Sequence, residues 1–132
     1  MEENQEKPYD IADNNRGIDM NDVIHESVLI NEHIKNTKEY KNYINTKRAL
    51  YDNMDLKNQL KEFRRKNYEL QNRVGVNPYD EVSALVREYD DLLHNSIVSD
   101  FLRAEQKICK QMQKVYDSIA DGLEFDYPDE QY

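Results

Sequence analysis

The sequence predicts an all-α protein, a bundle of about five helices with two long heptad-patterned helices. The 132 residues include only three glycines and three prolines, about half of the average usage. That is too few for the turns of a β-sandwich or a β-barrel. Charged residues make up 34% and apolar residues 38% of the chain, a balance that favours helices with much exposed surface. Apolar residues also recur at helical spacing along the central part of the chain.

The first helix is expected to begin after Asp19, because its carboxylate can accept from an unpaired N–H at a helix N-terminus. It is expected to end near Ile34. A break at residues 36–37 precedes a second helix, capped by Thr37, which ends in a kink or turn at residues 52–53. The apolar stripes of these two helices contain Met20, Val23, Ile24 and Val28, and then Tyr40, Tyr43, Ile44, Lys47, Leu50, Tyr51 and Met54.

The third helix, expected over about residues 55–73, has seam residues spaced alternately by four and by three. This spacing is typical of heptad helices that pack at a shallow angle. Gly75 suits the left-handed residue that follows a helix, whereas Asn77 suits the next N-cap and Pro78 the first helical position. The seam residues are Leu56, Leu60, Phe63, Asn67, Leu70 and Val74.

A fourth helix is expected from Pro78 to near His94, and a fifth, capped by Ser96, over residues 97–122. The fifth helix repeats the heptad spacing. Because long helices expose more surface per residue than a compact globule, the fold is expected to bury surface against another copy or another protein. The stripe of the fourth helix contains Val82, Leu85, Val86, Tyr89, Leu92 and Leu93, and the seam of the fifth contains Phe101, Glu105, Ile108, Met112, Val115 and Ile119.

Charge divides the chain into an acidic tail at residues 1–17, one helical domain at 18–123 and an acidic tail at 124–132, both tails expected to be disordered. The net charge is −9, yet residues 35–73 hold eleven Lys or Arg against five acids. Three interpretations of this basic stretch stay open: a solvated helix face, a contact with an acidic partner or RNA, and pairing with the chain's own acidic segments. The negative total argues against non-specific nucleic-acid binding, and no DNA partner is expected.

Enzymatic chemistry finds little support in the sequence. No glycine-rich phosphate loop is present, and His25 and His33 are too far apart for one ion without further ligands. Asp91 and His94 resemble only half of a di-iron motif, so a metal-dependent hydrolase is the weaker alternative. Cys109 is expected to be a buried or half-buried structural thiol. With no signal pattern and no apolar run of about 20 residues, the protein is expected to be cytoplasmic, without insertion into a membrane.

Two groups of residues are candidates for contacts with partners. Basic residues of the third helix share one face, and Tyr68 lies one turn further on. We call this candidate partner-binding surface the basic face; a solvated surface is the alternative. Asn67 and Glu105 are polar residues in the seams, where such groups specify register and partner choice at a cost in stability. They are expected to pair with each other or across an oligomer, unless the seams open to water there. The basic residues are Lys57, Lys61, Arg64 and Arg65, with Lys66 beside them.

Several short motifs follow one another along the helical part of the chain: Thr37-Lys38-Glu39-Tyr40-x-x-Tyr43, Leu60-x-Glu62-Phe63, Glu69-Leu70-Gln71 and Ala104-Glu105. Their order and spacing resemble the YlbF/YmcA family of small helical bacterial proteins, over about residues 20–123. The resemblance implies an all-α, non-enzymatic regulatory subunit of competence, sporulation and biofilm formation. It further implies self-association and, with a YaaT-like protein, direction of mRNA processing by the endoribonuclease RNase Y. Some members contribute cysteines to an iron–sulfur cluster, but Cys109 alone cannot hold a four-cysteine cluster, so no cofactor is expected.

Overall fold

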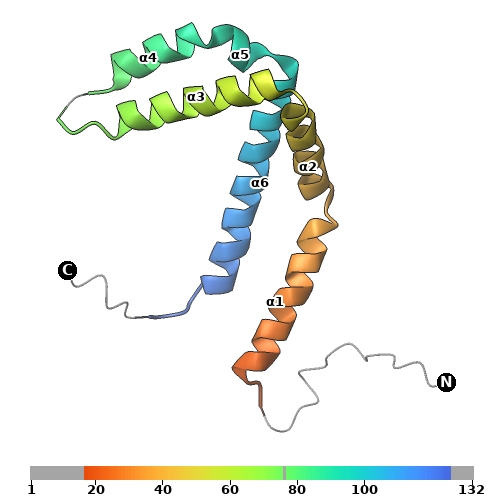
Figure 1. Ribbon diagram of the computed structural model, residues 1–132. Helices are drawn as coiled ribbons and strands as arrows, with labels where there is room; N and C mark the ends of the chain where they lie inside the picture. The colour runs from red at the N-terminus through yellow and green to blue at the C-terminus, as the bar shows by residue number, and fades with distance from the viewer. Residues whose placement is uncertain (1–16, 76, 126–132) are drawn as a thin grey trace. The chain divides into compact units, whose positions relative to one another are not determined.

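A computed structural model describes residues 17–75 and 77–125, and this part of the chain is all-α with six helices (Figure 1). It clusters into two compact units, residues 1–37 and 38–132, which we describe separately. Most of both expected tails lies outside the described residues, and the single domain 18–123 stays a prediction. The helices are α1 (Met20–Lys35), α2 (Lys38–Tyr51), α3 (Met54–Gln71), α4 (Tyr79–Glu88), α5 (Asp90–His94) and α6 (Ser96–Ala120).

The first unit contains α1, which begins where its sequence predicts. The Asp19 carboxylate accepts a hydrogen bond of 3.1 Å from the backbone N–H of Asp22, and the Asp22 carboxylate accepts one of 3.0 Å from the N–H of Asp19. This reciprocal pair satisfies two N–H groups at the helix start. At the other end, the Thr37 hydroxyl donates to the carbonyl of Ile34 at 2.7 Å. The predicted cap at Asp19 and the break before Lys38 are both confirmed.

The second unit consists of two helix pairs. The first pair is α2 with α6 and the second is α3 with α4, and Figure 1 shows the members of each pair side by side. A tight turn at residues 52–53 joins α2 to α3, as predicted, and the Asn53 side chain accepts from the N–H of Leu56 at 3.2 Å. The short helix α5 packs against α3, α4 and α6. The two long helices α3 and α6 therefore pack mainly on shorter helices rather than along each other.

The described residues confirm the all-α fold class, and they form six helices where the sequence predicts about five, because the expected fourth helix is two helices, α4 and α5. The break falls at Tyr89, whose backbone adopts φ −99° and ψ 19°. The Tyr89 ring lies 5.3 Å from that of Phe63, centroid to centroid. The tertiary contact thus coincides with the change of helix direction, and both Leu85 and Leu92 are buried on either side of it.

Two further helix starts differ from the prediction by one residue. Pro78 is the N-cap of α4 rather than its first residue, although the Asn77 side chain does accept from the N–H of Tyr79 at 3.1 Å. Asn95, not Ser96, caps α6. An amide oxygen at residue 95 reaches the N–H groups two and three positions on, which is the geometry of an N-cap. Gly75 has the expected positive φ, 80°.

The core of the second unit lies where the two helix pairs meet. We call it the corner core. The end of α2, the first half of α3, α5 and the start of α6 each contribute to it, and partly buried aromatic and aliphatic residues pack against it. Beyond the corner core the predicted seam of α3 becomes more exposed to solvent. Its last residue, Val74, lies after the end of α3 and is 95% exposed. No described helix combines the length and the apolarity that crossing a membrane requires. The corner core comprises Leu50, Leu60, Leu92, Val98 and Phe101.

Replacing Asn95 with alanine is expected to lower the free energy of unfolding by about 1–2 kcal/mol, because one side chain caps the longest helix. Its oxygen accepts from Ile97 at 3.0 Å and from Val98 at 3.3 Å, and Val98 is fully buried. Urea denaturation followed by circular dichroism measures the loss. Asn95→Asp, which retains an acceptor, is expected to lose less; equal losses in the two variants would contradict the capping role.

Candidate functional site

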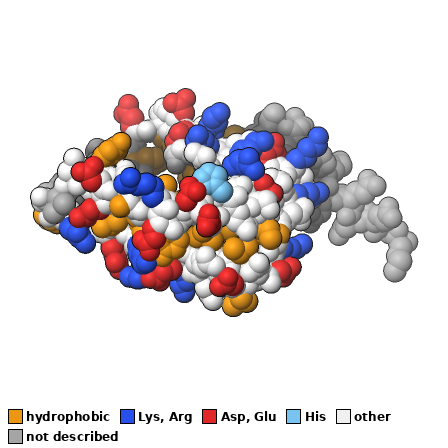
Figure 2. Space-filling model, turned by 90° about the horizontal axis from the view of Figure 1, so that it is seen from above, with side chains coloured by type: hydrophobic (Ala, Val, Ile, Leu, Met, Phe, Trp, Pro, Cys, Tyr) orange, Lys and Arg blue, Asp and Glu red, His pale blue; other side chains and the backbone are white. Residues whose placement is uncertain are grey.

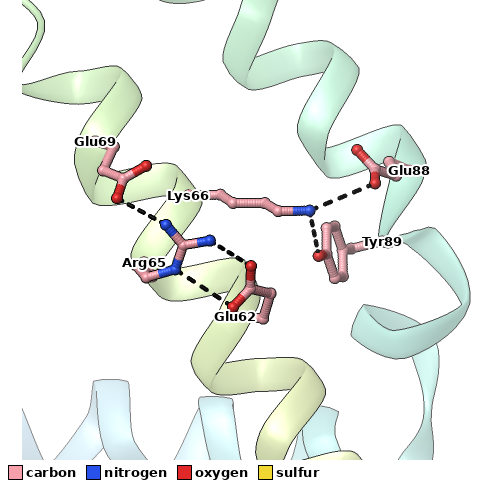
Figure 3. A network of polar contacts seen from close by, with 6 residues as sticks. All are labelled: Glu62, Arg65, Lys66, Glu69, Glu88 and Tyr89. Atoms are coloured by element: carbon pink, nitrogen blue, oxygen red, sulfur yellow. Dashed lines mark hydrogen bonds and ion pairs between the residues drawn. The ribbon is translucent and has the colours of Figure 1, made fainter.

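The basic face lies on α3, but the structure gives its cations different environments. Arg65 contacts two carboxylates of its own helix: it donates to Glu62 and, at 2.8 Å, to Glu69 (Figure 3). The hydrogen bond from Arg65 lowers the pKa of the Glu62 carboxyl, and the same bond raises the pKa of Arg65. Arg65 is thus part of an intrahelical network, and its charge is largely offset there.

Lys66 joins α3 to the break between α4 and α5. Its ammonium donates to the Tyr89 hydroxyl at 2.9 Å and lies 3.7 Å from a carboxylate oxygen of Glu88 (Figure 3). The hydrogen bond to Tyr89 is the main cause of the raised pKa of Lys66. Sequence analysis placed Lys66 beside the basic face and did not expect Tyr89 as its partner.

Arg64 contacts the other helix pair. Its guanidinium makes two hydrogen bonds to the carboxylate of Glu105 on α6, one of 3.2 Å, and lies 5.6 Å from the centre of the Phe101 ring. A planar guanidinium paired with both oxygens of a carboxylate is geometrically specific. Asn67 instead accepts a hydrogen bond of 3.1 Å from Gln71 on its own helix. The described contacts therefore do not pair Asn67 with Glu105, and a role for either residue between copies stays a prediction.

Lys57 and Lys61 are the cations of the basic face that no described carboxylate neutralises. The Lys57 ammonium lies 4.4 Å from the centre of the Tyr51 ring, a cation–π contact that leaves its charge available. Both lysines line a cavity of about 210 Å³ at the corner core, which we call the basic pocket. Its other lining residues are Leu50, Tyr51, Leu60, Arg64 and Phe101.

The basic pocket is small and amphipathic. Leu50, Leu60 and Phe101 are each almost fully buried and form its apolar part. Ligand cavities usually measure roughly 300–1,000 Å³, so a pocket of this size suits one large side chain rather than a whole cofactor. With lysines beside the apolar surface, it fits an apolar or aromatic group that has a carboxylate near it.

Tyr68, the last residue proposed for the basic face, is 69% exposed and does not line the basic pocket. Elsewhere the charges alternate: on the face seen in Figure 2, Lys and Arg side chains are interspersed with Asp and Glu. The site is therefore more compact than the sequence suggested. Lys57, Lys61 and Arg64 meet at the basic pocket, whereas Arg65 and Tyr68 lie outside its lining.

Sequence reasoning missed the contribution of the corner residues. Tyr51 and Phe101 were recognised only as stripe positions, because helical spacing shows which face a residue occupies but not which helix packs on it. One expectation was wrong: Cys109 is exposed, since it follows the half-buried Ile108 by one position and so points about 100° away around the helix.

The alternative metal site also differs from its prediction. The His94 ring nitrogen Nδ1 lies 3.2 Å from a carboxylate oxygen of Asp90, the residue before Asp91. Within residues 17–75 and 77–125, no cluster of three or more His, Cys, Asp or Glu side chains could hold a metal ion.

Comparison with known proteins gives the family of the chain. Neither the curated proteins nor the solved structures that were compared contain a match. One family model matches residues 23–124, a range that covers α1 to α6 except for the first three residues of α1. The chain therefore belongs to the family described as control of competence regulator ComK, YlbF/YmcA.

Proposed function

We propose that the protein is a cytoplasmic, non-enzymatic regulatory adaptor that acts through protein–protein contacts made at the basic pocket. Its output would be control of mRNA processing by an endoribonuclease, with a YaaT-like protein as co-partner, and thereby of developmental programmes such as competence and biofilm formation. The single observation that supports a contact role most directly is the basic pocket itself. It combines buried apolar side chains with two lysines that no described carboxylate neutralises.

The chemistry of the basic pocket favours a protein partner over RNA. Backbone recognition of nucleic acid needs several free cations in a row. On α3, however, Arg64, Arg65 and Lys66 are each paired with a carboxylate of this chain. Two lysines beside an apolar cavity match an acidic peptide segment with an apolar anchor better than they match a phosphate backbone. RNA binding through the same face is the alternative.

Self-association is part of the proposal, and exposed apolar residues on α1 support it. Seven apolar positions of α1 and its approach are more than a third exposed, and apolar surface left exposed on a helix favours association. A structural self-associating protein without a regulatory role is the remaining alternative. These residues are Ile18, Met20, Val23, Ile24, Val28, Leu29 and Ile30.

The test of the proposed contact reverses the two unpaired lysines. Lys57→Glu with Lys61→Glu is expected to weaken capture of the endoribonuclease or the YaaT-like protein by at least about tenfold, since reversal turns attraction into repulsion. Reversing Lys61, Arg64 and Arg65 together is also expected to weaken binding. However, it places new carboxylates beside Glu105, Glu62 and Glu69, so its effect on folding is harder to separate.

The matched control is Lys110→Glu with Lys114→Glu. It makes the same change of net charge on exposed residues of α6 outside the basic pocket. Purification from the native host with quantitative mass spectrometry measures capture, and circular dichroism checks the fold of each variant. Unchanged capture by the folded Lys57/Lys61 variant would refute the contact. Filter binding of RNA across a salt series, with no protein partner, separates the alternative: steeply salt-dependent binding would favour RNA.

A further inference from the structure

The basic pocket holds two lysines that have no acidic partner among the described residues. Lys57 and Lys61 lie about one turn apart on α3, and both line the pocket. Arg64, in the same lining, is already paired with Glu105. The pocket therefore presents the charge of two lysines beside an apolar lining, and a matching occupant carries a carboxylate next to an aromatic or apolar side chain.

The chain itself presents this chemistry at the start of α4. Tyr79 is 73% exposed, more than any other tyrosine of residues 17–75 and 77–125. The Asp80 carboxylate that follows it makes no ion pair within the described part of the chain, whereas Glu81 pairs with Arg73 at 3.1 Å. We call Tyr79 and Asp80 the acidic tip. It combines an exposed aromatic ring with an adjacent carboxylate that is available for a contact.

The other exposed tyrosines of the described residues lack this combination. Tyr68 and Tyr116 are also exposed. However, the carboxylates that follow them, Glu69 and Asp117, already accept hydrogen bonds of 2.8 Å and 2.9 Å from side chains of their own helices. Tyr51 is itself part of the lining of the basic pocket. The acidic tip is therefore the described feature that best matches the chemistry of the pocket.

The acidic tip cannot reach the basic pocket of its own chain. It lies by the end of α3, where Glu81 contacts Arg73, whereas Lys57 lies near the start of that helix. Lys57 and Gln71 are 14 positions apart, which corresponds to about 21 Å along a continuous helix. Figure 1 shows the start of α4 at the opposite end of α3 from α2 and α6, whose residues complete the pocket. An acidic tip that occupies this pocket therefore has to belong to a second copy.

We propose that the acidic tip of one copy inserts into the basic pocket of a second copy, with the Tyr79 ring on the apolar lining and the Asp80 carboxylate against Lys57 and Lys61. The contact joins two different surfaces, so assembly closes into a ring or extends as a chain. It also occupies the surface at which a regulatory partner is proposed to bind. That competition rests on the proposed function, whereas the contact between copies does not.

Mixing two complementary variants of the full-length protein tests the contact. The tip variant carries Tyr79→Ala with Asp80→Lys, and the pocket variant carries Lys57→Glu with Lys61→Glu. Each variant alone lacks one side of the contact, but a mixture brings an intact tip to an intact pocket. Sedimentation of one labelled variant, titrated with itself or with the other, is expected to show at least about tenfold tighter association in the mixture. Association through α1 is the same in every sample and cannot produce this difference.

The matched control is Tyr116→Ala with Asp117→Lys, which makes the same changes at exposed residues of α6 outside the basic pocket. It is expected to self-associate as the unmodified protein does. Circular dichroism checks the fold of each variant. If the tip variant does not fold, Asp80→Asn removes the charge alone and is expected to weaken self-association and its dependence on salt.

A charge exchange identifies the contacting groups. Asp80→Lys combined in one chain with Lys57→Asp and Lys61→Asp is expected to restore association that Asp80→Lys alone loses. Equal affinity in the mixture and in the separate variants, an equal loss in the α6 control, or unmodified protein that stays monomeric at every concentration would each overturn the proposal. Because the samples contain only this chain, failure here is distinct from failure of the proposed function.

Discussion

Replacing Phe101 with alanine is expected to lower the free energy of unfolding by about 3–5 kcal/mol, the range for removing a buried aromatic side chain. Phe101 is 4% exposed, and its ring lies 5.9 Å from that of Tyr43 in a stacked arrangement. The Arg64 guanidinium, held by Glu105, lies 5.6 Å from the same ring. The substitution therefore removes a contact between α2 and α6 together with the apolar surface of the basic pocket.

Urea denaturation monitored by circular dichroism measures this loss, and Phe101→Leu provides a graded comparison. Leucine keeps apolar volume in the corner core, so a loss below about 1.5 kcal/mol is expected. If partners bind at the basic pocket as proposed, capture is expected to fall in Phe101→Leu even though most of its stability remains, because the substitution removes an aromatic ring from the lining of the pocket. If Phe101→Ala lowers the free energy of unfolding by less than about 1 kcal/mol, the corner core does not stabilise the fold as proposed.

Leu50→Ala is expected to have the second-largest effect, a decrease of about 2–5 kcal/mol in the free energy of unfolding. Leu50 is 1% exposed at the end of α2 and belongs to the corner core with residues of α3, α5 and α6. Truncation there leaves a cavity where four helices meet. Because the surrounding backbone is fixed by those helices, the site has little room to collapse, and the upper part of the range is expected.

The matched control for Leu50 is Leu123→Ala, which removes the same atoms at a position that is 57% exposed, outside the helices. It is expected to change stability by less than about 0.5 kcal/mol. If Leu50→Ala does not fold, Leu50→Met preserves volume and is expected to lose less than about 1.5 kcal/mol. Similar losses for Leu50→Ala and Leu123→Ala would contradict the assignment of the corner core.

Most helices were predictable from the sequence, and the places where the prediction failed have physical causes. Asp19 marks a helix start through a bond to the N–H group three residues on, which the local sequence predicts directly. Asn53 caps α3 in the same way, although the sequence predicted only a kink or turn there. The break between α4 and α5 at Tyr89 has no such local signal. Tyr89 continues an apolar stripe, and the contacts of its ring with Phe63 and of its hydroxyl with Lys66 come from another helix.

The candidate site was predictable only in part. Helical spacing correctly placed Lys57, Lys61, Arg64 and Arg65 on α3, along about two turns of the helix. It did not show that Arg65 contacts Glu62 and Glu69, because an arginine with acids at neighbouring turns is equally compatible with an exposed, unpaired arrangement. Nor did it show the cavity, whose lining comes from α2, α3 and α6.

The sequence by itself determined the fold class, most helix boundaries and the distribution of charge, because helical periodicity and end caps act over about four residues. Only the tertiary structure decided which cations remain without an acidic partner. Arg64 meets Glu105 from 41 positions away, and Lys66 meets Tyr89 from 23 positions away. Contacts of such separation depend on how the two helix pairs meet at the corner core. Local sequence does not specify how the helix pairs meet. Their arrangement places Lys57 and Lys61 beside the basic pocket.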